Sequence, residues 1–283
     1  MSTVCAPPAA PPSTGPGCRD RTTASRRRSV ETAIGTMREQ LSEPLSLRTI
    51  ARAAATSPYH FDRIFRQVTG VPPFRFLTAL RLDTARHLLL TTRFSATAIC
   101  FEVGYNSVGS FTRQFAESVG MPPHRLRCFA AAGGGAATLA RAREVQDAPA
   151  AIPGGIEGRV ETPEDFAGVI FVGAFSTPMP SGRPGACVLL HGAGPFRTPP
   201  VADGTWHVFA AGLPLSPGAA PGGDLLHEDV LRGAAGPLRV RGGEVQGEVE
   251  IVLRPRLSID PPILVSLPIL LSERLSASPA GAG

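Results

Sequence analysis

Small or hydrogen-bonding residues recur at helical spacing around one arginine, and they form an outward face of Gly109, Thr112, Arg113 and Ala116. Arginine can donate two hydrogen bonds to a guanine edge, and threonine can meet the methyl group of thymine. A helix that carries these residues could therefore read bases in the major groove of DNA. A solvent-exposed helix face has a similar composition, so that alternative stays open for this stretch alone.

The apolar residues on the opposite side of this helix predict that it is the second helix of a helix-turn-helix unit. An apolar stripe indicates a helix over residues 107–119 with one side in a core, and its members are Val108, Phe111, Phe115 and Val119. Gly104 permits a left-handed C-cap that ends the preceding helix. Asn106 or Ser107 can then accept the first free backbone N–H bonds of the new helix.

Residues 46–70 repeat this layout. A short helix with Leu47 and Ile50 inward is followed by Ser57 and Pro58, which are typical of a helix start. Phe61, Ile64 and Phe65 form the core stripe of the second helix, and its remaining side chains point outward or lie near the helix start: Tyr59, His60, Asp62, Arg63 and Arg66.

A long helix is predicted between the two copies, over residues 74–92, with Arg75, Arg81 and Arg86 on its polar side. At 1.5 Å per residue it spans roughly 25–30 Å. Such a helix could hold two reading heads about one DNA turn apart, roughly 34 Å.

An ordered series of positions runs from Val30 to Arg127 and resembles the AraC/XylS family of bacterial transcription regulators. Its members are Ser57-Pro58-Tyr59-His60-Phe61, Phe65, Gly70, Arg81, Ala85, Leu88, Leu89, Ile99, Gly104-Tyr105, Phe111, Arg113, Phe115, Gly120, Pro122 and Arg127. The resemblance implies two helix-turn-helix units on one rigid helix, entering adjacent major-groove segments on one face of the DNA.

The resemblance also assigns the contacts. It places base or groove contacts at Tyr59, Asp62 and Arg63, with Arg66 on the same outer face, and in the second unit at Val108, Gly109, Thr112 and Arg113. Arg127 closes the motif with His124 and Arg125 nearby, and a loop just past the second reading helix is expected to meet phosphate.

Four residues depart from the usual family pattern. Ala55 stands where the first turn often has Gly, and Cys100 where the second unit usually has Ala. Val108 and Gly109 replace commonly polar residues, so base reading by the second helix is expected to rest mainly on Thr112 and Arg113.

Charge divides the chain into two unlike halves. The formal net charge of the 283 residues is +5, but residues 1–128 hold 17 Arg and 8 Asp or Glu, giving +9, whereas residues 129–283 hold 11 Arg and 15 acids, giving −4. Since arginine contacts with phosphate release condensed counterions, only the first half is expected to meet DNA. The length allows two domains, each with its own core.

The first half is expected to begin with a disordered arm over residues 1–28, rich in Pro, Ala, Gly and Ser, before a core helix at about 30–41. Residues 129–157 read as a Gly-rich linker that lets the domains move independently. No run approaches the roughly 18–20 apolar residues of a membrane span, and no signal peptide is recognisable, so a cytoplasmic location is expected. Five cysteines without paired spacing are expected to be free thiols.

The second half predicts an antiparallel β-sandwich over residues 158–275 and a disordered tail over 276–283, so the fold class is multidomain α + β. Its short β-prone runs are separated by Gly, Pro and Asp clusters, and they are 168–173, 186–191, 205–211 and 249–254. The stretch 201–210 weakly resembles transthyretin-like or carboxypeptidase-regulatory-like β-sandwich modules.

Three roles remain open for this second domain: sensing a small molecule, dimerisation, and an enzyme or metal-binding module that the first half targets to DNA. His191, His207, His227 and Cys187 suggest the metal alternative, but compact ligand spacing is missing. A GxSxG nucleophile elbow is also missing. We therefore predict no catalytic residues, metal ligands or cofactor, and the expected partners are double-stranded promoter DNA, RNA polymerase, a small effector at the second domain and a second copy of the chain, without a membrane.

Overall fold

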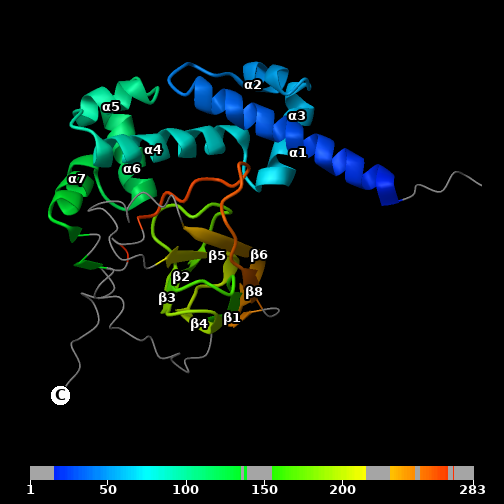
Figure 1. Ribbon diagram of the computed structural model, residues 1–283, viewed down its shortest axis with the longest axis vertical. Helices are drawn as coiled ribbons and strands as arrows, with labels where there is room; N and C mark the ends of the chain where they lie inside the picture. Colours follow the sequence, from blue (N-terminus) through cyan, green and yellow to red (C-terminus); the bar gives the residue numbers. More distant parts are fainter. Residues whose placement is uncertain are drawn as a thin grey trace, which may run out of the picture.

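The computed structural model describes residues 16–134, 137–138, 155–214, 230–245, 249–266 and 270. Seven helices come first in these ranges and two β-sheets follow, which confirms the predicted α + β class. The helical domain and the β domain lie against each other, with the helix α4 facing the sheets (Figure 1). Within the described ranges, every helix is too short or too polar to cross a membrane.

The helices follow the predicted order closely. They are α1 (Pro16–Glu39), α2 (Leu47–Ala53), α3 (Pro58–Thr69), α4 (Pro73–Thr91), α5 (Ala96–Glu102), α6 (Val108–Val119) and α7 (Pro123–Ala131). The reading helix predicted over 107–119 and the long helix predicted over 74–92 each agree within one residue at either end. One apolar core joins all these helices, so the two helix-turn-helix units form a single folded body.

The N-terminal arm differs from the prediction, because α1 begins at Pro16 and residues 16–28 are helical rather than disordered. Only the later part of α1 buries an apolar stripe, which includes Val30, Ile34 and Met37. Upstream side chains from residue 22 are exposed, so periodicity could not reveal that the helix extends there. An Arg27–Glu31 pair one turn apart, with Nε and Oε1 at 3.0 Å, supports this exposed section. Residues 1–15 lie outside the described ranges.

The β domain contains β1 (Gly155–Glu161), β2 (Gly168–Phe175), β3 (Ala186–Leu190), β4 (Gly194–Pro200), β5 (Gly204–Pro214), β6 (Leu231–Arg241), β7 (Glu244–Val245) and β8 (Val249–Val252). One sheet has the order β4-β1-β8 and the other β3-β2-β5-β6-β7. The sheets are antiparallel as predicted, apart from β1 and β8, which pair in parallel. β8 follows β7 of the larger sheet rather than β1 in the chain. No hairpin joins β1 to β8, so the two strands are free to run in parallel.

The five-stranded sheet is covered on both faces. One face packs against the smaller sheet around Ile170, Val172 and Val208, and the other carries a second apolar layer that includes Phe171 and Val265. Every residue of β2 is therefore buried, as expected of a continuous apolar strand. β1 begins three residues before the predicted domain boundary at 158. The predicted linker and C-terminal tail fall mostly or entirely outside the described ranges.

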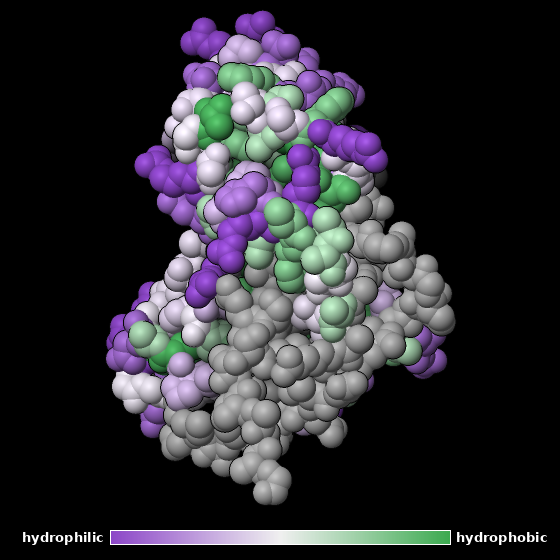
Figure 2. All heavy atoms as spheres, turned by 90° about the vertical axis from the view of Figure 1, so that its left-hand side faces the viewer, coloured by the Kyte–Doolittle hydropathy of each residue, from purple (hydrophilic) through white to green (hydrophobic). Residues whose placement is uncertain are grey.

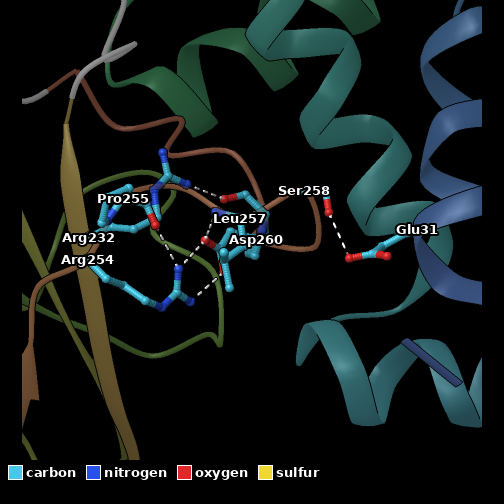
Figure 3. A network of polar contacts seen from close by, with 8 residues as sticks. Glu31, Arg232, Arg254, Pro255, Leu257, Ser258 and Asp260 are labelled. Atoms are coloured by element: carbon cyan, nitrogen blue, oxygen red, sulfur yellow. Dashed lines mark hydrogen bonds and ion pairs between the residues drawn. The ribbon is translucent and has the colours of Figure 1, made fainter. Parts of the chain in front are cut away.

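The two domains are joined through a shared core, which differs from the predicted independent motion. After β8 the chain returns to the helices, where Leu264 and the β-domain residue Met179 join the helical core. Arg86 of α4 is buried at this junction, and its Nη1 donates to the carbonyl of Ile263 at 2.8 Å. Figure 3 shows a second connection, from Ser258 Oγ to Glu31 of α1 at 3.2 Å. These contacts involve residues that are far apart in sequence.

Candidate DNA interface

The first helix-turn-helix unit consists of α2 and α3. Ser46 caps α2 by accepting the N–H of Thr49 at 3.1 Å, and Pro58 occupies the first turn of α3. Phe61 and Phe65 anchor the inner side of α3, with ring centroids 5.4 Å apart. These local signals hold α3 rigidly on the core and leave its other side in solvent.

The exposed side of α3 carries four of the predicted contact residues. Tyr59 is 86% exposed, which is unusual for an aromatic side chain without a partner surface. Arg63 is exposed and lies 3.3 Å from Nδ1 of His60. Asp62 is half-buried and accepts from Nε of Arg66 at 2.9 Å, so it orients that guanidinium. The structure thus brings all four together on one outer face.

The second unit, α5 and α6, repeats the layout of the first. Ser95 accepts the N–H of Ala98 at 3.0 Å, and Ser107 caps α6 by accepting from the N–H of Ser110, which confirms one of the two predicted caps. Phe111 and Phe115 anchor α6 with ring centroids 5.7 Å apart. Tyr105 donates to Oε1 of Gln114 at 2.8 Å and fastens the turn to α6, and burial raises its pKa to about 12.

Gly104 allows the turn of the second unit to pack tightly. Its φ is +82°, as predicted for a left-handed C-cap. An added Cβ would lie 2.8 Å from the carbonyl oxygens of Leu41 and Ser42 and 2.9 Å from Nη2 of Arg81. Only glycine fits both the conformation and the space at this position.

The outer face of α6 is smoother than that of α3. Arg113 is exposed and Thr112 half-buried, and both lie on the same side as Gly109. A Cβ at Gly109 would meet only Ser107 Oγ, at 3.9 Å, so the backbone is open to a close approach. Val108 is half-buried at the start of α6, and the buried part of its side chain packs against the helical core.

Arg127 has a structural position, and its expected contact with phosphate stays a prediction. Its Nε donates to the carbonyl of Leu89 at 3.1 Å and its Nη2 to that of Phe94 at 2.7 Å. It thereby joins α7 to the end of α4 and the loop before α5. Arg81 acts similarly in the first unit, donating to the carbonyls of Leu41 and Glu43. His124 and Arg125 are exposed at the start of α7 and stay predictions as phosphate contacts.

Two basic residues on α2 were not singled out from the sequence. Arg48 and Arg52 are both exposed and line a shallow groove with Thr56, Ser57 and Pro58, at the start of α3. A helix N-terminus presents free N–H groups, and neighbouring arginines add positive charge. Their position one turn apart on the first helix of the unit was the available signal. Figure 2 shows a different side of the helical domain, the one nearest α5 and α7, where hydrophilic side chains are mixed with hydrophobic ones.

The metal alternative gains no support from the described part of the chain, where no group of three or more His, Cys, Asp or Glu could hold an ion. Cys187 lies half-buried on β3, and His191 follows that strand. His227 falls outside the described ranges.

The helical domain is similar in sequence to helix-turn-helix transcription regulators. Residues 50–128 match the family described as "Helix-turn-helix domain". The uncharacterized HTH-type transcriptional regulator YobQ of Bacillus subtilis is 30% identical over 95 residues, covering 34% of this chain and 39% of that protein. An uncharacterized HTH-type transcriptional regulator of Haemophilus influenzae is 35% identical over 98 residues, covering 35% of this chain and 33% of that protein.

A solved structure of a transcriptional regulator from Chromobacterium violaceum, described as a protein with an AraC-type DNA-binding domain, is 28% identical in sequence. The alignment covers 38% of this chain and 95% of that chain, with a TM-score of 0.36. The chain spans well under half the length of the two sequence relatives it matches. The resemblance of the β domain to transthyretin-like modules stays a prediction.

Proposed function

We propose that the AraC-type helix-turn-helix domain of residues 50–128 makes this chain a transcription regulator that binds promoter DNA through two reading helices, α3 and α6. The observation that carries the proposal is the pair of matched units on α4, which at 19 residues is about 28 Å long at 1.5 Å per residue. That length suits two helices in adjacent major-groove segments on one face of the DNA.

The exposed residues of the two helices support distinct roles. Arg63 and Arg113 are the proposed base readers, because a guanidinium can bond a guanine edge bidentately. Thr112 is proposed to meet a thymine methyl, and Tyr59 to pack in the groove. Asp62 would orient Arg66 towards phosphate, an arrangement supported by their 2.9 Å pair.

Close approach and added phosphate contacts complete the proposed interface. Val108 and Gly109 would line the groove at the start of α6, where the absent side chain of Gly109 lets the backbone near the DNA. Arg48 and Arg52 beside the start of α3 are proposed phosphate contacts, and so is Arg125 at the start of α7.

The β domain is proposed to regulate rather than to bind phosphate, since its half of the chain has a formal charge of −4. A small effector and a second copy of the chain are the proposed partners of the β domain. RNA polymerase is a proposed partner of the whole protein at the promoter. The protein would act in the cytoplasm, where bacterial DNA is accessible, and would not be an enzyme. An enzyme or metal-binding module is not favoured, because the helical domain is similar to transcription regulators.

The proposal is tested by mapping bound DNA across the genome with the full-length protein, followed by binding to the best site over a series of salt concentrations. We expect discrete sites about two groove segments long. The logarithm of the binding constant should fall with the logarithm of salt concentration by roughly 0.9 for each phosphate neutralised. General binding without enriched sites would contradict sequence reading by α3 and α6.

A further inference from the structure

A pocket lies where the outer face of the five-stranded sheet meets the helical domain. Its walls come from β2, β5 and β6, from the returning chain at residues 260–265, and from the last residue and C-cap of α3. The volume is about 250 Å³, and most lining side chains are apolar, including Phe171, Phe175, Phe209 and Ile263. Concave apolar sites with a few polar groups are the usual form of small-molecule sites.

Arg232 of β6 supplies a buried positive charge in this pocket. It is only 8% exposed, and its Nη1 donates to the carbonyl of Pro261 at 3.1 Å. Among the described residues, three buried side-chain atoms have no hydrogen-bond partner, Arg86 Nε, Arg232 Nε and Ser266 Oγ, and of these residues only Arg232 lines the pocket. A buried unsatisfied donor is costly and calls for a partner.

Asp260 also lines the pocket and attracts Arg232 electrostatically, but its hydrogen bonds go to other groups. Asp260 accepts two hydrogen bonds from Arg254, at 2.7 and 2.8 Å, and one from the N–H of Leu257 (Figure 3). Burial lowers the pKa of Arg232 to about 10, with repulsion from Arg256 as a further cause, so its guanidinium stays charged at neutral pH. Arg232 therefore brings a positive charge into the pocket, and its hydrogen bond described above is to a carbonyl rather than to an acid.

The pocket is mechanically connected to both reading helices. Thr69 and Gly70 at the end of α3 form part of its wall. Ile263 and Val265 form another side of the pocket. The carbonyl of Ile263 also accepts a hydrogen bond from Arg86 of α4. One residue further, the N–H of Ser266 donates to the carbonyl of Val119 at the end of α6, at 3.3 Å.

We infer that this pocket binds a small organic carboxylate with an apolar body, its carboxylate paired with Arg232 and its body packed on the phenylalanines, and that occupancy changes DNA affinity through the ends of α3 and α6. A planar guanidinium matches a carboxylate bidentately, which favours this anion. The regulatory half of the inference rests on the proposed DNA-binding function, whereas the binding site itself does not.

Binding is measured first, without DNA, by isothermal titration calorimetry on the full-length protein. The probes are straight-chain monocarboxylates from pentanoate to decanoate and 3-phenylpropionate, each compared with the alcohol of the same skeleton. We expect at least one carboxylate to bind more tightly than its alcohol. No binding by any carboxylate, or equal binding of the acid and the alcohol, would overturn the site.

Two matched variants separate the pocket from general charge effects. Arg232→Gln removes the buried charge and should weaken carboxylate binding about tenfold or more, because a charge-assisted pair is lost. Arg239→Gln changes an exposed arginine on the same strand and should leave binding unchanged. Equal losses in both variants would contradict the assignment to Arg232.

A third variant keeps the test decisive if Arg232→Gln does not fold. Ala234 is exposed at the edge of the pocket, so Ala234→Phe should fill the space without disturbing the core and should abolish binding of the acid. Undiminished binding in a folded Ala234→Phe protein would overturn the location of the site.

Regulation is then measured as DNA affinity with and without the best carboxylate. We expect affinity for the enriched DNA site to change at least severalfold in the wild type and not in Ala234→Phe. A wild-type protein that binds the probe and the DNA without any coupling would overturn the regulatory half alone. A protein that binds the probe but no specific DNA would instead contradict the proposed function.

Discussion

The two helix-turn-helix units share a scaffold but present different faces. The residues that build α3 recur 50 positions later in α6: Ser57 and Ser107 at the caps, Phe61 and Phe111, Phe65 and Phe115 in the core, Gly70 and Gly120 at the left-handed ends. The outer residues differ at the same spacing, with Tyr59, Asp62 and Arg66 in the first unit replaced by Gly109, Thr112 and Ala116. Arg63 and Arg113 alone are shared among these outer positions.

This contrast separates what folds the helices from what would touch DNA. The first face offers long charged side chains and an exposed aromatic ring, which favour contacts with phosphate and groove walls. The second offers small side chains around one arginine, which favour a close fit of the backbone. We therefore expect the first unit to supply more of the affinity, and the second to discriminate by fit.

The largest expected effect tests whether the scaffolds are truly equivalent. Phe61→Ala and Phe111→Ala each remove a fully buried ring from the shared helical core. Each should lower the free energy of unfolding by about 3–5 kcal/mol, because transfer and cavity terms add. Denaturant unfolding of both variants measures this. A large loss for one and a negligible loss for the other would show that only one unit depends on its ring.

The second prediction concerns the turns. Gly104→Ala should destabilise by about 2–4 kcal/mol, since it combines a left-handed alanine with a clash against the carbonyls of Leu41 and Ser42. Gly109→Ala is a matched control, because its added Cβ meets only Ser107 Oγ, at an ordinary contact distance of 3.9 Å. Thermal unfolding of the two variants gives the comparison, and equal melting temperatures would contradict the packing described at the turn.

The third prediction separates structural from contacting arginines at the end of the second unit. Arg127→Gln loses two hydrogen bonds from a charged group to backbone carbonyls and should destabilise the fold by about 1.5–3 kcal/mol. Arg125→Gln should leave stability unchanged and reduce the salt dependence of DNA binding by about one phosphate contact. A reduced salt dependence in Arg127→Gln, with no change in Arg125→Gln, would favour Arg127 as the phosphate contact.

The fourth prediction compares the two reading heads directly. Arg63→Ala and Arg113→Ala should each weaken binding to the specific DNA site by about 1–3 kcal/mol and relax base preference at one position. The matched control is Arg159→Ala, an exposed arginine on β1 of the β domain. Competition binding against single-base variants of the site provides the measurement. Two variants with unchanged affinity and unchanged preference would contradict the proposed docking.

Sequence periodicity located the helical domain well because its signals are local. The caps at Ser57 and Ser107 and the glycine at 104 lie within a few residues of the helix ends that they define. Strands β4 and β6 were not among the predicted runs, because proline and glycine interrupt their apolar pattern. β4 tolerates its prolines as an edge strand of its sheet.

The contacts between the domains could not be read in this way. Arg86 looked like part of a solvated helix side, yet it is buried by residue 263, far away in sequence. The pocket around Arg232 likewise forms where β6, residues 260–265 and the end of α3 come together. The residue pattern within each of these segments does not indicate which distant segments it contacts. Arg127 was assigned to phosphate from its place after α6, whereas its partners on α4 and the following loop become visible only in the fold.

The smallest expected effect lies at the first turn, where Ala55 occupies the position that Gly104 occupies in the second. Each follows its helix C-cap and has positive φ, +52° at Ala55 and +82° at Gly104. The left-handed region costs an alanine about 1–2 kcal/mol, and the greater freedom of an unfolded glycine offsets about 0.5–1 kcal/mol of any gain. Ala55→Gly should therefore stabilise the protein by about 0.5 kcal/mol, measured by denaturant unfolding. A destabilised Ala55→Gly protein would mean that the first turn does not hold its left-handed residue as the second does, and that the two scaffolds differ at this point after all.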